Sequence, residues 1–385
     1  MSNVPQITLV PGLEGVVAAE TRLSSVEGKA GELIIAGFPV EELAGRATFE
    51  ETIYLLWHDV LPGQGQLMAF REALSVRRPL PRATLDLLRA AASERGPVMD
   101  ALRMAAGTLS IGTPVDALID DEFYGDALAL VARLPTIVAA YWRMLNGKEP
   151  VAPDPELSHA ANYLYMLTGE VPSDEFARAL ETYLNTVADH GLNASTFAAR
   201  LIVSTRSDVV SAVVGAIGAL KGPLHGGAPG PALDSVFEIG EAGRAEPYLR
   251  EKIERGERLM GFGHRVYKVR DPRADVLAAA AERLYTSGGD VALYELGLEV
   301  EKTALRLLAT YKPGRNLKTN VEFYTALLLH GLRLPTGLFT PTFAIGRVAG
   351  WTGHCMEQRA QDRLIRPQSR YTGPRDRYWV PLEKR

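Results

Sequence analysis

Apolar residues recur along most of this chain at the spacing of one face of an α-helix. Between residues 176 and 187 they stand at Phe176, Leu180, Tyr183, Leu184 and Val187. Residues separated by four, seven or eight positions share one helix face, so the pattern predicts an amphipathic helix. The same spacing predicts helices over residues 49–58, 65–76, 83–94, 156–168, 272–286 and 291–310.

Alternation of apolar and polar residues, the period of a half-buried strand, is scarce in the sequence. The exception runs from Leu23 to Phe38, where Glu27-Gly28-Lys29-Ala30-Gly31 separates two short runs and predicts a small β-hairpin. Strands that alternate with helices would indicate a doubly wound parallel sheet, and the sequence does not show that order. We therefore expect an all-α fold with one minor hairpin near the N-terminus.

Two segments are apolar on every side. The first, Val209–Leu220, carries several Ala and Gly residues among Val and Ile, and the second follows Thr340-Pro341. A helix that is apolar all round is buried in a folded protein. We expect each segment to be a core helix or part of a subunit interface.

Glycine and proline, the residues that interrupt regular structure, cluster at 222–231, 312–317 and 331–341. We interpret these clusters as hinges between two units. The prediction is a large helical domain of residues 1–225 and 331–385 and a small mobile domain of residues 226–330.

The composition mainly excludes some classes of protein and partner. The 385 residues are 46% hydrophobic and 23% charged with a net charge of −4, which is typical of a globular enzyme and gives no basic excess for nucleic acid or an anionic membrane. Cys355 is the only cysteine, so an internal disulfide is excluded and a reducing cytoplasm is favoured. The longest apolar run, Val209–Leu220, is shorter than the roughly 20 residues of a membrane span. Residues 1–10 lack the pattern of a secretory signal.

The segment from Met260 to Arg273 combines three features that suit an anionic substrate. Gly261 and Gly263 allow a backbone to approach a ligand closely, and His264 can exchange a proton near neutral pH. Asp271 followed by Pro272 predicts an N-cap and a first helical residue, which places Arg273 in the first turn as an anion clamp. A simple loop with a solvated arginine is the alternative.

Three histidines stand beside glycine in loops between predicted helices, at His190, His225 and His264. No clustered Cys and His spacing predicts a metal site. His225 precedes a helix expected from about Pro231, and the positive end of a helix dipole disfavours imidazolium. A neutral imidazole can donate a hydrogen bond to a developing oxyanion. The alternative is a histidine that only caps a turn.

Two further features are ambiguous on their own. Asn320 predicts an N-cap that puts Glu322 in a first helical turn, where an acidic residue is also favoured by the dipole alone. The stretch from Arg359 to Arg385 is basic, and we interpret it either as a solvated tail or as an arm that brings Arg366 to an anionic site.

Together these segments resemble the citrate synthase family in its compact bacterial and archaeal form. The resemblance runs from Gly12 to Pro367 and so covers nearly the whole chain. The stretches that carry it are Asp189–Phe197, Lys221–Ala228, Gly261–Arg273, Asn320–Tyr324 and Gly346–His354.

The resemblance implies a two-domain helical homodimer with its active site between the domains. It implies condensation of acetyl-CoA with oxaloacetate and hydrolysis to citrate and CoA, the citrate synthase step of the tricarboxylic acid cycle. Coenzyme A would enter as a substrate thioester, and no tightly bound cofactor is expected. By the same resemblance His225 would hydrogen-bond the enolate oxygen, His264 would protonate the oxaloacetate carbonyl, and Glu322 would remove the methyl proton.

The binding residues also come from the resemblance. Those implied for the oxaloacetate carboxylates are His190, Arg273 and Arg347. Arg366 is implied to reach the same carboxylates from the partner subunit. Those implied for coenzyme A are Met260, Gly261, Phe262, Gly263 and Lys268.

Glu322 departs from the family pattern, which has aspartate in Asn-Val-Asp-Phe-Tyr-Ser-Gly. The extra methylene moves the carboxylate by roughly 1 Å, a displacement that can cost about 10²-fold in rate. Thr325 and Ala326 also differ from the pattern, and we interpret them either as repacking that restores the geometry or as a drifted site. Every other catalytic position of the pattern is present. A citrate synthase is therefore the main hypothesis. The alternatives are a 2-methylcitrate synthase that uses propionyl-CoA and a non-catalytic paralogue that binds oxaloacetate or CoA.

Overall fold

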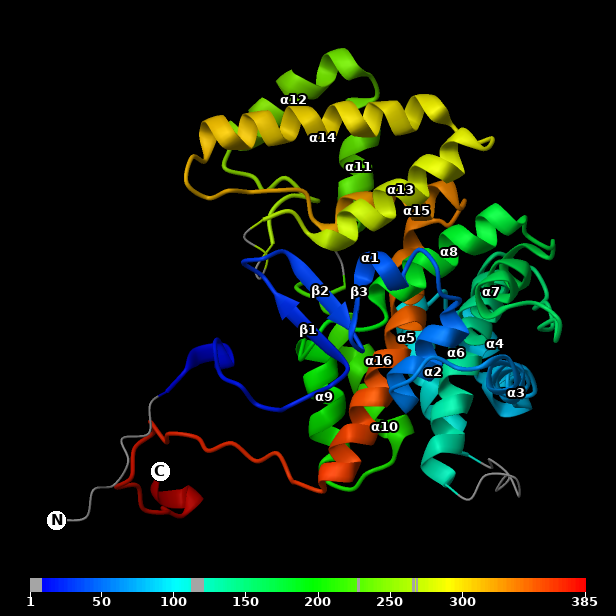
Figure 1. The fold of residues 1–385 in the computed structure, drawn as a ribbon. Helices are drawn as coiled ribbons and strands as arrows, with labels where there is room; N and C mark the ends of the chain where they lie inside the picture. Colours follow the sequence, from blue (N-terminus) through cyan, green and yellow to red (C-terminus); the bar gives the residue numbers. More distant parts are fainter. Residues whose placement is uncertain (1–8, 112–120, 227–228, 265–266, 268) are drawn as a thin grey trace.

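The computed structural model describes residues 9–111, 121–226, 229–264, 267 and 269–385, and helices dominate it (Figure 1). The predicted all-α fold class is confirmed. The larger group of helices comprises α1 (Val40–Leu43), α2 (Phe49–His58), α3 (Gln64–Ser75), α4 (Arg82–Ser93), α5 (Val98–Gly107), α6 (Glu122–Leu145), α7 (His159–Thr168), α8 (Asp174–Val187), α9 (Ala194–Val203), α10 (Val209–Leu220) and α16 (Phe339–Gln361).

A second group of helices lies at the top of Figure 1. Within it α13 packs on α15 and α14 packs on α12, while α13 also packs on α8 of the larger group. Its members are α11 (Pro229–Ile239), α12 (Ala242–Glu254), α13 (Pro272–Thr286), α14 (Val291–Tyr311) and α15 (Val321–Gly331). The short 3-10 turns of the chain are Pro11–Leu13, Thr108–Ser110, Thr336–Leu338 and Leu382–Lys384.

The predicted hairpin is confirmed. Strand β1 (Ser24–Glu27) pairs antiparallel with β2 (Glu32–Ile35), with Ser24 opposite Ile35. A third strand, β3 (Phe38–Pro39), pairs with β2 and was not predicted, because two residues are too few to show an alternating pattern.

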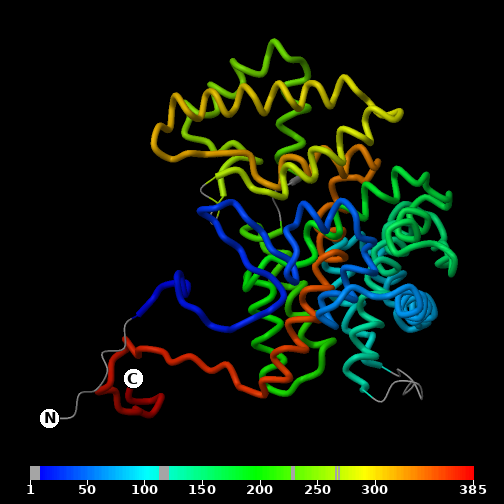
Figure 2. The backbone as a smooth tube through the Cα atoms, viewed as in Figure 1, coloured from blue at the N-terminus to red at the C-terminus, as the bar shows by residue number. Residues whose placement is uncertain are grey.

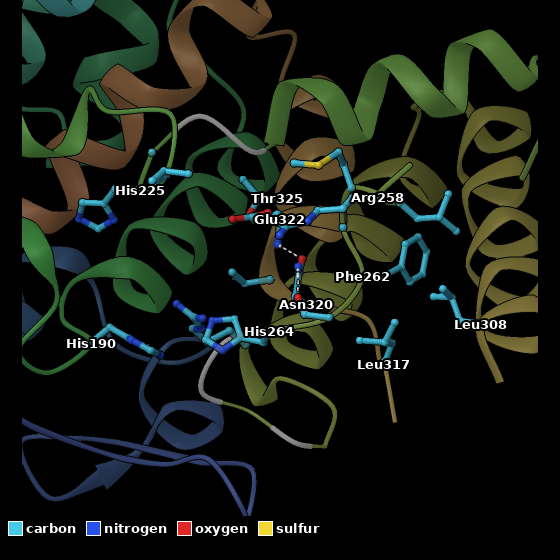
Figure 3. A pocket seen from close by; sticks show the side chains of 18 of the residues that line it. His190, His225, Arg258, Phe262, His264, Leu308, Leu317, Asn320, Glu322 and Thr325 are labelled. Carbon is cyan, nitrogen blue, oxygen red and sulfur yellow. Dashed lines mark hydrogen bonds between the residues drawn. The ribbon is translucent and has the colours of Figure 1, made fainter. Parts of the chain in front are cut away.

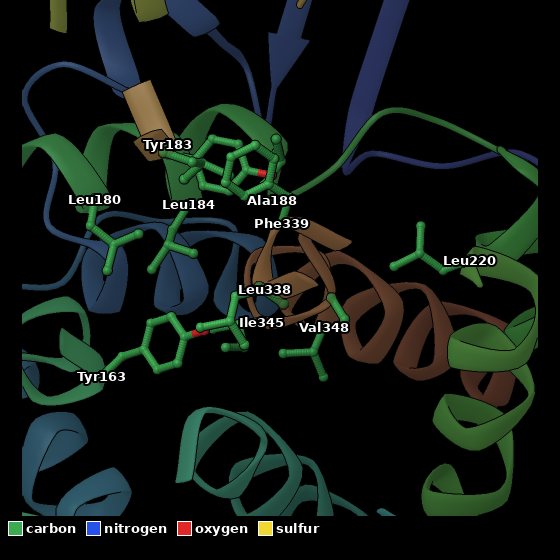
Figure 4. Packing of buried hydrophobic residues seen from close by; sticks show 14 of the residues in the cluster. Tyr163, Leu180, Tyr183, Leu184, Ala188, Leu220, Leu338, Phe339, Ile345 and Val348 are labelled. Atoms are coloured by element: carbon green, nitrogen blue, oxygen red, sulfur yellow. The ribbon is translucent and has the colours of Figure 1, made fainter. Parts of the chain in front are cut away.

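The two segments that are apolar on all sides form central helices of the larger group. The predicted Val209–Leu220 is α10, which packs against α9, α5 and α16. The second segment is α16, and it contacts α9, α6, α8 and α10. Its residues Ile345 and Val348 are fully buried beside Leu184 and Tyr163 (Figure 4).

Helix starts agree with the capping rules, with one correction. Asp271 accepts a hydrogen bond from the Arg273 amide, and Asn320 accepts one from the Glu322 amide, as predicted. The helix expected over 156–168 begins instead at His159, because the Ser158 side chain caps it by accepting from the amide of Ala161.

Helix α6 is, by length and composition alone, apolar enough to cross a membrane. The sequence analysis overlooked it because Arg133 interrupts its apolar run. Of its most apolar window, 72% is buried inside the protein, as in a core helix of a globular fold, so α6 is weak evidence for a membrane span.

Both terminal segments extend away from the helices in Figure 2. Beyond α16 the chain forms no further α-helix, and its side chains Tyr371, Tyr378 and Trp379 are largely exposed. On the N-terminal side Leu9 and Val17 are exposed as well.

Candidate active site

A cavity of about 970 Å³ has walls from both groups of helices. Figure 3 shows side chains of the larger group on one side and those of the second group on the other. Of the residues singled out in the sequence, those that line the cavity are His190, His225, Met260, Gly261, Phe262, Gly263, His264, Arg273, Glu322 and Arg347. Arg366 does not line it and lies exposed on the tail, and Lys268 lies outside the described residues.

A short β-bridge joins the glycine segment to the start of α15. The amide of Gly263 donates to the Lys318 carbonyl at 2.7 Å, and the amide of Asn320 donates to the Gly261 carbonyl at 3.0 Å. The Asn320 side chain donates from Nδ2 to the Gly263 carbonyl at 2.8 Å and accepts from the Glu322 amide at 3.0 Å (Figure 3). His264 and Glu322 are therefore held in one unit.

Gly261 has to be glycine for two reasons. Its φ is +87°, in the left-handed region. A Cβ added there would also lie 3.0 Å from the Cβ of Phe323, the residue after Glu322. The bridge therefore brings the backbone of the histidine segment directly against the first turn of α15.

The tautomer of His264 follows from its backbone partner. The amide of Tyr267 donates to Nδ1 of His264 at 3.1 Å. A ring nitrogen that accepts a hydrogen bond carries no proton, so the neutral ring is protonated on Nε2. The ring thus has the form of a hydrogen-bond donor.

His190 lies on the opposite wall, edge-on to His264 with the ring centroids 6.0 Å apart. Its Nε2 is 3.2 Å from the Tyr267 hydroxyl. Burial holds the pKa of His190 well below its usual range, and the positive charges of Arg273 and Arg347 lower it further.

Glu322 has the properties of a general base. Burial raises the pKa of its carboxyl to about 7, with Arg273 lowering it and Asp271 raising it. Among the residues that the structure describes, none donates a hydrogen bond to this carboxylate. A carboxylate whose pKa lies near the working pH is well matched to taking a proton.

His225 is held by a hydroxyl. Its Nε2 lies 2.8 Å from Oγ of Ser195, which accepts from Nε1 of Trp351 at 3.0 Å and donates its proton to Oδ1 of Asn193 at 2.8 Å. Burial, and then the charge of Arg347, lower the pKa of His225 to about 4. The ring is therefore neutral at physiological pH.

Two buried arginines bring positive charge to the cavity. Arg273 binds the Asp271 carboxylate through Nε at 3.0 Å and Nη2 at 2.7 Å. Arg347 donates from Nε to the Val187 carbonyl at 2.6 Å, and its two terminal nitrogens have no hydrogen bond to the described residues. Burial lowers the pKa of Arg347 to about 10, so it stays charged near neutral pH. Such a pair suits a ligand with more than one carboxylate.

The sequence analysis missed other residues of this cavity. Arg258, Lys312 and Arg315 line it, and Arg258 lies on the same side as Phe262, Leu308 and Leu317 in Figure 3. Residues 312–317 had been interpreted only as a hinge, since nothing in their spacing shows that they face residues 256–263. Among the described residues, no group of three or more His, Cys, Asp or Glu could hold a metal ion.

The comparisons with known proteins agree with one another. Residues 12–368 match the family model "Citrate synthase, C-terminal domain". The chain is 41% identical to citrate synthase 2 of Bacillus subtilis, covering 98% of this chain and 100% of the relative. It is 40% identical to citrate synthase of Haloferax volcanii (97% and 98%) and 39% identical to 2-methylcitrate synthase of Mycobacterium tuberculosis (95% and 91%).

Solved structures give the same result. Citrate synthase from Pyrobaculum aerophilum superposes with a TM-score of 0.88 at 36% identity, covering 98% of this chain and 97% of that one. Citrate synthase from Thermoplasma acidophilum, in a ternary complex with carboxymethyl coenzyme A and oxaloacetate, gives 0.87 at 30% identity, covering 97% and 98%. With the family model spanning most of its length, this chain belongs to the citrate synthase family.

Proposed function

We propose that this chain condenses acetyl-CoA with oxaloacetate and water to give citrate and CoA. The observation that carries the proposal is the shared cavity of a buried carboxylate with a pKa of about 7, Glu322, and two histidines, His225 and His264. Enolate formation beside a thioester needs a base and an oxyanion donor together, and addition to a ketone needs an acid.

In the first step the Glu322 carboxylate takes a proton from the methyl carbon of acetyl-CoA. The enolate oxygen accepts a hydrogen bond from Nδ1 of His225. For this the Ser195 hydroxyl has to turn its single proton from Oδ1 of Asn193 to Nε2 of His225, which puts the ring proton on Nδ1. The neutral ring keeps the donor matched to an enolate.

In the second step the enolate carbon attacks the oxaloacetate ketone, and Nε2–H of His264 gives its proton to the ketone oxygen. His190, Arg273 and Arg347 hold the two carboxylates and so orient the ketone toward the enolate. Water then cleaves the thioester bond of the condensed product, which releases CoA and citrate.

Coenzyme A would lie along the end of the cavity that Met260, Gly261, Phe262 and Gly263 line. Backbone groups there suit an adenine ring, and Arg258, Lys312 and Arg315 suit phosphates. Lys268 is expected near the same phosphates. Coenzyme A enters as a substrate thioester, and we expect no tightly bound cofactor.

The assembly we propose is a homodimer in the cytoplasm, with no nucleic-acid or membrane partner. The exposed apolar side chains of the two terminal segments support a dimer, since they are unusual on a monomer surface. Residues 1–225 with 331–385 would form the large domain, and 226–330 the small one. Closure of the small domain would exclude water until the carbon–carbon bond has formed.

A 2-methylcitrate synthase is the second candidate, since a relative of that name is as similar as the citrate synthases. The deciding experiment measures thiol release with oxaloacetate and either acetyl-CoA or propionyl-CoA. We expect a higher kcat/KM with acetyl-CoA. A preference for propionyl-CoA would favour the second candidate, and no release with either thioester despite oxaloacetate binding would indicate a non-catalytic paralogue.

A further inference from the structure

A chain of buried polar side chains runs beside the cavity without lining it. Asp189, Arg200 and His354 are fully buried in the larger group of helices. Charged groups taken out of water are costly unless they are paired and hydrogen-bonded. Each of these three side chains has such partners, and together they form one continuous network.

His354 sits at the centre of the network in a single tautomer. Nη1 of Arg200 lies 2.9 Å from Nδ1 of His354. A guanidinium can only donate, so Nδ1 accepts and the ring proton is on Nε2. That nitrogen lies 3.2 and 3.3 Å from the two carboxylate oxygens of Asp189. The imidazole therefore links guanidinium to carboxylate in one orientation.

The carboxylate end of the network holds the turn that carries His190. Ser24 donates its hydroxyl proton to Oδ2 of Asp189, and its Oγ accepts from the amide of Gly191 at 2.7 Å. The Gly191 amide also lies 3.3 Å from Oδ2 of Asp189. Asp189 and Gly191, the residues on both sides of His190, are thus held by hydrogen bonds that lie outside the cavity.

The guanidinium end holds the last turn of α16 and the start of the tail. Arg200 donates to Glu357 at 2.8 Å, to Gln358 at 3.1 Å and to Gln361 at 3.4 Å. Nε2 of Gln358 in turn donates to the carbonyl of Arg363 at 2.9 Å. The tail that begins here carries Arg366.

We propose that Asp189, His354 and Arg200 form a positioning relay that fixes the direction of His190 and ties its turn to the root of the C-terminal tail. The inference rests on the proposed role of His190 as an oxaloacetate ligand. The His190 ring bonds to the Tyr267 hydroxyl, and Tyr267 lies in residues 226–330, the proposed mobile domain. Within the larger group of helices, the orientation of the His190 ring is therefore set by the backbone of the turn that carries it.

The test compares His354→Ala with His354→Gln in the full chain. Steady-state kinetics are measured for both substrates, and calorimetry measures oxaloacetate binding without acetyl-CoA. We expect His354→Ala to raise the oxaloacetate KM and Kd about tenfold, since it breaks the link between the buried Asp189 and Arg200, and to leave the acetyl-CoA KM within about twofold. The Gln amide can accept from Arg200 and donate to Asp189, so His354→Gln should restore most of the affinity.

His159→Ala is the matched control. It removes another buried imidazole, in α7, whose Nε2 has no hydrogen-bond partner. It should lower the Tm without moving the oxaloacetate KM. If His354→Ala does not fold, Ser24→Ala on the short strand β1 removes the clamp on Gly191, and we expect a rise in the oxaloacetate KM in the same direction.

Three results would overturn the relay. These are an unchanged oxaloacetate Kd in both His354→Ala and Ser24→Ala, an equal rise in His159→Ala, or a folded His354→Gln as weak as His354→Ala. Failure of the proposed function is distinguishable, because it would appear as absent thiol release by the wild-type chain, whereas the calorimetric Kd tests the relay without turnover.

Discussion

Glu322 is the side chain of this cavity that we propose as the general base. Its backbone position is set by the Asn320 cap, and its carboxylate is buried without a hydrogen-bond donor in the described part of the chain. The family pattern has the shorter aspartate here. The side chain therefore reaches further into the cavity than the shorter residue would from the same backbone.

Substituting Glu322 separates carboxylate chemistry from side-chain length. We expect Glu322→Asp to keep or raise kcat, and Glu322→Gln to lower it by about 10²–10⁴-fold, the usual contribution of a general base. Thiol release at saturating substrates measures both. If Glu322→Asp is as inactive as Glu322→Gln, the pocket has been rebuilt around the longer side chain.

The pH profile tests the same carboxyl independently. Its pKa is raised to about 7, and the base works only when ionised, so kcat/KM should rise with pH through about 7 and then level off. His225, with a pKa near 4, and His190, whose pKa is well below its usual range, are already neutral there and should add no second step.

Glu181→Gln is the control for that profile. Burial and the nearby Glu50 raise the pKa of the Glu181 carboxyl to about 7 as well, but this side chain does not line the cavity. The midpoint of kcat/KM should stay unchanged in Glu181→Gln. A wild-type midpoint near the ordinary glutamate value of about 4.3 would contradict the raised pKa of Glu322, and a midpoint that moves in Glu181→Gln would contradict its assignment to Glu322.

At the scale of single residues, the sequence predicts hydrogen bonds between residues that are close in sequence, such as helix caps. Asp271 and Asn320 are N-caps because each meets an amide two residues on. The contact of Ser195 with His225 spans 30 residues, and Arg258 lines the same cavity as Lys312 and Arg315 although more than 50 residues separate them in sequence. Those partners follow from packing, which no spacing in the sequence reveals.

At the scale of elements, many helices could be predicted from a buried apolar face, but α5, α9 and α12 were not, although each buries apolar residues. The period of α8 and the all-apolar α10 gave their bounds closely. The start of α7 and the strand β3 were not predicted, since each depends on a few hydrogen bonds that leave no periodic trace. Helix α6 was missed as a long apolar element because one arginine interrupts it.

The bridge between the glycine segment and α15 gives an element-scale prediction. Gly261→Ala should destabilise the protein by about 1–3 kcal/mol more than Gly314→Ala, because overpacking against Phe323 adds to the backbone strain. Gly314 is the matched control: its φ of +86° equals that of Gly261 within a degree, and an added Cβ there meets nothing within 4 Å.

Chemical denaturation gives the two free energies of unfolding, and thiol release gives the rates. We expect a fall in kcat for Gly261→Ala, since the displaced Phe323 adjoins Glu322, and none for Gly314→Ala. Equal losses in the two variants would show that the close contact with Phe323 is unimportant.

At the scale of the molecule, the cavity draws its residues from two sources. His264, Arg273 and Glu322 come from the second group of helices, and His190, His225 and Arg347 come from the larger group. The sequence clusters at 222–231 and 331–341 lie where the chain passes between the groups. The distances between these six side chains therefore depend on how the two groups of helices are placed relative to each other.

The tail gives a prediction about assembly. If Arg366 acts in the partner's site, Arg366→Ala and Glu322→Ala homodimers should both be nearly inactive. Mixed and reassembled, they should recover about a quarter of the wild-type activity, because half of the dimers are hybrids with one intact site. Recovery should follow subunit exchange, which native mass spectrometry measures. No recovery despite hybrid formation would place Arg366 in the site of its own chain.

The amide of Tyr267 assigns the proton of His264. A main-chain N–H has no titration in the physiological range, and every residue except proline supplies it. The acid of the proposed reaction is therefore set by a main-chain atom, so a substitution of the Tyr267 side chain removes its hydroxyl contact with His190 but leaves the proton of His264 on Nε2. Alanine scanning would pass over this control, and only Tyr267→Pro would remove it.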